Sequence, residues 1–156
     1  MVFLNIQIII MGNSVSTKKV NFEDIQYLFK NTKPYLLINT LNSNEQDILI
    51  KNTISINKEE KIINDMLYKN IEITIIVYDK NANAPNLMTK YTQLVNLGFS
   101  NVYIYPGGLF EWLCLQDIYS FDNFPTTKND IVVDILKFKG KSVFNTFLLS
   151  DSYDLD

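Results

Sequence analysis

Apolar residues recur along the chain in two alternating patterns, one with helical spacing and one of short unbroken runs. Helical spacing predicts helices over residues 20–31, 58–70, 86–98 and 109–119. Short apolar runs predict strands over residues 34–40, 53–57, 71–79 and 101–105. The run IEITIIVYD is apolar almost throughout and rich in β-branched residues, as expected for a central parallel strand covered on both faces. We therefore expect an α/β sandwich with a central parallel sheet and helices on both faces.

The predicted helices carry end signals and apolar stripes. Asn21 can cap the first helix, Pro85 suits the first turn of the third, and Gly98 suits the C-terminal cap of the third. Each of the first three helices is expected to bury one stripe. The stripes are Phe22, Ile25, Leu28 and Phe29; Ile62, Ile63, Met66 and Leu67; and Leu87, Met88, Tyr91, Leu94 and Val95.

The alternating pattern weakens after Tyr119. SFDNFPTTKND predicts a loop, and the next run, IVVDILKF, fits either a helix or an edge strand. We divide the chain into an N-terminal segment at 1–19, one domain at 20–119 and a C-terminal extension at 120–156.

The composition excludes several kinds of chemistry. All 14 basic residues among the 156 are lysines, and there is no histidine. The chain therefore has no Ser–His or Cys–His pair, no His-ligated metal site and no bidentate arginine clamp for phosphate. A single cysteine, Cys114, excludes an internal disulfide. A net charge of −3 without a basic cluster argues against nucleic-acid binding.

The N-terminal segment contains a possible acylation signal. MGNSVSTKK, from Met11, matches M-G-x-x-x-[ST], with Gly12 as the acceptor of myristate. The motif works only if translation starts at Met11 rather than Met1. Otherwise FLNIQIII is an ordinary strand and the match is chance. One acyl chain binds a membrane only marginally, so a second signal is needed, and Lys18 and Lys19 would be a weak one.

Three segments resemble, in order and spacing, the rhodanese-like domain: YLLINTLNSNEQDILIKNTISIN, ITIIVYDKNANAP and LVNLGFSNVYIYPGGLFEW. The most specific residues of this pattern are Gly98, Phe99, Val102, Gly107, Gly108 and Trp112. The resemblance covers roughly residues 20–115 and implies a three-layer sandwich. The chain also looks like the small rhodanese-like proteins of protists and large DNA viruses.

The departures from the family pattern imply an inactive member. The family has a persulfide-forming cysteine at the end of its central strand, where this chain has Asp79. Asn39 and Leu41 stand where the family has Asp and Arg, and Leu49 stands where it often has His. A carboxylate has no sulfur to transfer, and it would repel thiosulfate or phosphate.

The degenerate loop consists of Asp79, Lys80, Asn81, Ala82, Asn83 and Ala84, and it has three interpretations. It is a structural turn whose aspartate caps the following amides, a site for a ligand or partner such as a cation or amine, or a catalytic loop with Asp79 as base or nucleophile.

We expect structural roles for most of the other residues that could carry chemistry. Cys114 is expected to be a buried structural cysteine. Gly107 and Gly108 are expected to form a tight turn, and Glu59 and Glu60 to lie on a solvated face. The aromatic residues near the C-terminal helix would form a partner surface if partly exposed. These are Phe110, Trp112, Tyr119, Phe121 and Phe124.

The sequence thus predicts a non-catalytic interaction or scaffold domain that binds no cofactor, metal or nucleic acid, with an unknown protein partner. Two alternatives stay open: a sulfurtransferase or phosphatase-like enzyme acting by a non-standard route, and a structural component of a viral particle. We expect a cytoplasmic protein, held at the cytosolic face of a membrane if Gly12 is acylated.

Overall fold

The computed structural model describes residues 16–129 and contains three strands, four α-helices and one short 3₁₀ helix in that part of the chain. In chain order they are α1 (Phe22–Lys30), β1 (Tyr35–Asn39), η1 (Ser43–Glu45), α2 (Ile56–Lys69), β2 (Thr74–Tyr78), α3 (Pro85–Asn96), β3 (Val102–Tyr105) and α4 (Gly108–Tyr119).

The sheet is parallel, with the strands in the order β1-β2-β3. In its register Leu37 pairs with Ile76, and Ile76 pairs with Tyr103. Single bridges extend both edges, because Lys19 pairs with Ile104 and Thr53 pairs with Leu37. Because the strands are parallel, the carboxyl ends of all three lie at the same end of the sheet.

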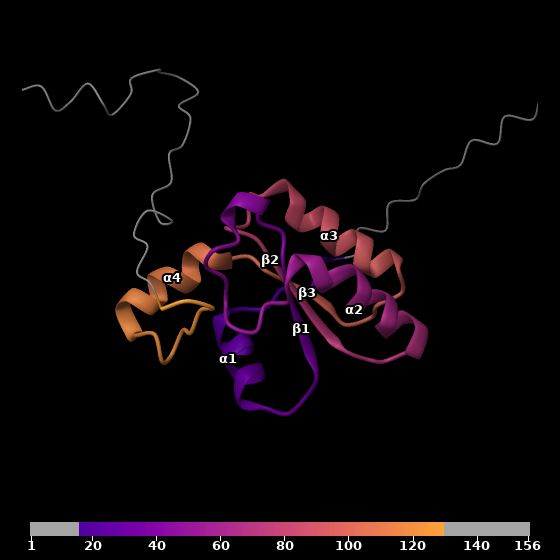
Figure 1. Ribbon diagram of the computed structural model, residues 1–156, viewed down its shortest axis with the longest axis horizontal. Coiled ribbons are helices and arrows are strands. Elements are labelled where there is room, and N and C mark those ends of the chain that lie inside the picture. The colour runs from indigo at the N-terminus through magenta and orange to yellow at the C-terminus, as the bar shows by residue number, and fades with distance from the viewer. Residues whose placement is uncertain (1–15, 130–156) are drawn as a thin grey trace, which may run out of the picture.

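Helices cover both faces of the sheet (Figure 1). On one face, α2 and α3 bury residues such as Ile63 and Leu94 against alternate strand residues. On the other face, α1 and α4 bury Ile25, Leu109 and Trp112 against the remaining strand residues. The expected three-layer α/β sandwich is confirmed.

The helix-end signals are confirmed. Asn21 and Asp24 form a reciprocal capping box at the start of α1. Pro85 is the first residue of α3. Gly98 follows α3 with φ +102°, and its amide and that of Phe99 bond to carbonyls of the last turn.

Two predictions about the secondary-structure elements are wrong. The strand expected over 53–57 is a single bridge at Thr53, because α2 already begins at Ile56. Met88 is 42% exposed, because the buried stripe of α3 follows Leu87, Tyr91 and Leu94 only. The N-terminal motif at Gly12 and the segment 131–138 lie outside the described residues.

The segment after α4 packs onto the core. Phe124 is 3% exposed and lies edge-to-face with Trp112, with ring centroids 5.0 Å apart. The indole Nε1 of Trp112 donates to the carbonyl of Pro125 (3.2 Å). Thr126 forms an antiparallel bridge with Ile50. Within residues 16–129, no helix is long and apolar enough to cross a bilayer.

Candidate functional site

The candidate site lies where the three parallel strands end. Open α/β sheets bind ligands outside the carboxyl ends of their strands. Thr40 directly follows β1, Asp79 directly follows β2, and the Gly107–Gly108 turn leads from β3 into α4. The backbone amide of Thr40 donates to the carbonyl of Tyr78 (2.9 Å), so the two strand ends are fixed to one another.

Asp79 is buried, with 5% of its surface exposed. Its carboxylate accepts hydrogen bonds from the Thr40 hydroxyl and from the amide of Lys80 (2.6 Å). Among the described residues it accepts no bond from the first turn of α3. Asp79 thus caps one amide, that of the next residue, and its other bonded partner is Thr40 at the end of β1.

The backbone carbonyls of the same loop cap α4. The amide of Leu109 donates to the carbonyl of Asp79, and the amide of Phe110 donates to that of Lys80, each at 2.9 Å. Gly108 has φ +62°, and a Cβ there would lie 2.2 Å from the Asp79 carbonyl oxygen. The predicted tight turn is confirmed, and the close approach of the loop explains why it needs glycine.

The rest of the loop is held by local bonds and one ion pair. The Asn81 side-chain oxygen accepts from the amide of Asn83 (2.9 Å), and Ala84 is the N-cap residue of α3. The Lys80 ammonium bonds to the Glu45 carboxylate (2.8 Å), which lowers the pKa of Glu45. Lys80 is therefore already neutralised by a neighbouring carboxylate.

A small cavity of about 170 Å³ opens beside this ion pair. Its apolar lining is Leu41, Ile48 and Leu109, and Glu45 and Lys80 complete it with other polar residues. The volume is below the roughly 300 Å³ at which small-molecule sites usually begin.

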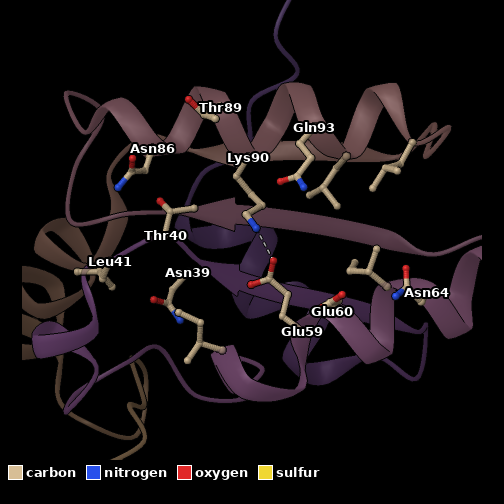
Figure 2. A pocket seen from close by; sticks show the side chains of 14 residues that line it. Asn39, Thr40, Leu41, Glu59, Glu60, Asn64, Asn86, Thr89, Lys90 and Gln93 are labelled. Carbon is tan, nitrogen blue, oxygen red and sulfur yellow. Dashed lines mark hydrogen bonds and ion pairs between the residues drawn. The ribbon is translucent and has the colours of Figure 1, made fainter.

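A larger hollow of about 710 Å³ lies between α2 and α3 and reaches Thr40 (Figure 2). The Glu59 carboxylate and the Lys90 ammonium form an ion pair across it at 2.5 Å. Only 14% of the Glu59 side chain is exposed, so the expectation of a solvated residue is wrong for Glu59 and confirmed for Glu60. Glu59 is covered because the Lys90 side chain reaches it from α3 across the hollow.

A comparison with protein-family models matches residues 27–114 to the rhodanese-like domain. This chain belongs to the rhodanese-like domain family. Two solved structures share the fold of this rhodanese-like domain. The BH2092 protein of Bacillus halodurans is 18% identical, with a TM-score of 0.52 over 64% of this chain and 74% of its own. Ygr203w, a yeast protein tyrosine phosphatase of the rhodanese family, is 12% identical, with a TM-score of 0.51 over 71% of this chain and 92% of its own. No curated protein sequence matches the chain.

The positions at which this rhodanese-like domain departs from the family pattern are buried. Asn39 is 4% exposed, and its side-chain oxygen accepts from the Gln46 amide (2.7 Å). Leu41 and Leu49 are also buried in the core. Because asparagine and leucine are uncharged, these three side chains present no charge to a ligand at the strand ends.

Cys114 differs from its sequence prediction. It is only partly buried, because helical spacing places it on the side of α4 away from the buried Leu109 and Trp112. Within residues 16–129, no group of three or more Cys, Asp or Glu side chains is placed to hold a metal ion.

The sequence does not predict the partners of the residues in the loop and in the hollow. Thr40 is 39 residues from Asp79, Glu45 is 35 residues from Lys80, and Glu59 is 31 residues from Lys90. No local pattern signals these pairs, because each is created only when separate elements pack.

We expect Thr40→Val to lower the free energy of unfolding by about 1.5–3 kcal/mol, the usual contribution of a hydrogen bond to a charged group. The substitution keeps the shape but leaves the buried Asp79 carboxylate with the Lys80 amide as its bonded partner. Urea unfolding measures the change. Thr40→Ser keeps the hydroxyl and is the matched control. Equal losses in the two variants would contradict the role of the hydroxyl.

Proposed function

We propose that this rhodanese-like domain is a non-catalytic interaction module that binds a protein partner and transfers neither sulfur nor a phosphoryl group. One observation carries the proposal. At the end of β2, where the family resemblance places a reactive thiol, a buried carboxylate is bonded to Thr40 and to the Lys80 amide. An oxygen atom in this position cannot form a persulfide.

The charges around the loop support the same conclusion. Asp79 and Glu45 place two carboxylates at the edge of the sheet, and Lys80 already pairs with Glu45. The chain has no arginine or histidine to clamp an oxyanion or to act as a general acid. An anionic donor such as thiosulfate or an aryl phosphate would meet net negative charge here.

Cys114 is poorly placed to replace the missing thiol. It lies five residues after Leu109, whose amide bonds to the loop. This spacing puts it about 7.5 Å further along the helix axis, at a rise of about 1.5 Å per residue. It is also on the outer side of α4, while the loop contacts the first turn.

Enzymatic assays test this proposal. We expect purified full-length protein to show only background rates of thiosulfate-to-cyanide sulfur transfer and of aryl-phosphate hydrolysis, because no nucleophile lies in the loop. Mass spectrometry after incubation with thiosulfate should find no added sulfur atom. Cys114→Ser is the control. A rate above background that disappears in this variant would show catalysis through Cys114 and overturn the proposal.

We further propose that the module is tethered to the cytosolic face of a membrane by myristate on Gly12. The motif MGNSVSTKK supports this proposal and requires a start at Met11. The expected result is a native protein that begins at Gly12 with the added mass of the acyl chain, measured by intact-mass spectrometry. A Gly12→Ala variant expressed from the Met11 start should lack that mass. Native protein that retains Met1 would contradict the tether.

A further inference from the structure

The outer side of α4 carries an apolar ridge. Phe110, Cys114 and Ile118 lie at i, i+4 and i+8, so they follow one line along the helix. Phe110 is 39% exposed and Ile118 is 69% exposed, and Cys114 is partly exposed. We call these three residues the outer ridge of α4.

The opposite side of α4 is already buried. Leu109 and Trp112 are 1% and 0% exposed and belong to the core. A surface helix normally places polar residues opposite its buried stripe, and a helix that is apolar all round is normally covered on all sides. In Figure 1, α4 lies at the outside of the domain, with its outer side away from the sheet. The outer ridge therefore lacks a cover within the described residues.

The charges beside the ridge are acidic. Asp117 is exposed and lies beside Ile118, whereas the Glu111 side chain folds back over Gly107 toward Tyr105. There is no lysine between Lys90 and Lys128, so α4 has no basic residue. The exposed charge of Asp117 repels an anionic lipid surface. It attracts an apolar surface that is bordered by positive charge.

We propose that the outer ridge of α4 docks an amphipathic helix of a protein partner whose apolar face is flanked by lysine or arginine. The proposal deepens the proposed function, on which it rests, by naming the surface and the class of partner. Apolar residues of the partner would pack between Phe110 and Ile118 and cover the Cys114 side chain. The exposed Asp117 would pair with a basic residue beside the apolar face of the partner.

Cys114 provides a direct measurement, because it is the single thiol and lies in the middle of the ridge. The probe is a synthetic amphipathic helical peptide of leucine and lysine, and its matched control has glutamate in place of lysine. We expect the leucine–lysine peptide to slow alkylation of Cys114 by iodoacetamide in the full chain at least tenfold at saturation. The leucine–glutamate peptide should have no effect, and added salt should weaken the protection.

Two variants locate the binding surface. Ile118→Ser should raise the peptide concentration needed for half-protection at least tenfold. Tyr68→Ser, at a 91% exposed apolar position on α2, should leave it unchanged. Circular dichroism checks that both variants are folded.

Four results would overturn the proposal. They are no protection by the leucine–lysine peptide, equal protection by both peptides, protection by anionic vesicles instead, and slow alkylation before any peptide is added. The last result would mean that the chain itself or a second copy covers the ridge. Sulfur-transfer and phosphatase rates measured on the same preparation report separately on the proposed function, so the two failures are distinguishable.

Discussion

Gly108→Ala is expected to lower the free energy of unfolding by about 2–5 kcal/mol, the sum of left-handed backbone strain and a steric clash. The added Cβ would lie 2.2 Å from the Asp79 carbonyl oxygen and 2.7 Å from that of Lys80. Relief of this clash would move the loop and lengthen its two hydrogen bonds to α4. Urea or thermal unfolding measures the change.

Gly98→Ala is the matched control for this prediction. Gly98 also has positive φ, +102°, but nothing lies within 4 Å of its added Cβ. Gly98→Ala should therefore lower the free energy of unfolding only by the backbone strain, about 1–3 kcal/mol. If Gly108→Ala is no more destabilising than Gly98→Ala, the loop carbonyls do not approach Gly108 as closely as the structure indicates.

Trp112→Ala is expected to lower the free energy of unfolding by about 3–5 kcal/mol, the usual cost of truncating a buried tryptophan. Trp112 is fully buried and lies edge-to-face with Phe29, Tyr105 and Phe124. Its removal would leave a cavity between α1, α4 and the segment after α4. The loss is measured by urea unfolding.

Trp112→Phe separates packing from hydrogen bonding. It keeps an aromatic ring but loses the Nε1 donor to the Pro125 carbonyl. We expect a loss of about 1–3 kcal/mol, the cost of one unsatisfied buried group. A Trp112→Ala loss no larger than this would show that the residues around Trp112 repack, contrary to the expectation of a cavity.

The same helix links the two proposals. Amides in the first turn of α4 donate hydrogen bonds to carbonyls of the degenerate loop. The outer ridge on the same helix is the surface that we propose for the partner.

The sequence by itself determined the presence of the four helices, the start of α1, both ends of α3, the parallel sheet and the absence of a thiol at Asp79. These features depend on local spacing or on the identity of one residue. Asn21 caps α1 through a residue three positions away, and Gly98 adopts a conformation that glycine favours wherever a helix ends. The sequence left open whether the aromatic residues near α4 are exposed; Trp112 and Phe124 are buried, whereas Phe110 and Tyr119 are exposed.

Only the tertiary structure decided which distant residues meet. The sequence contains Thr40, Glu59 and Lys90 as ordinary polar residues. They are paired because β1 and β2 end side by side and because α2 and α3 lie on the same face of the sheet. It also decided that Cys114 is only partly buried, since a helix with apolar residues on most of its sides gives a weak periodic signal of which side is buried.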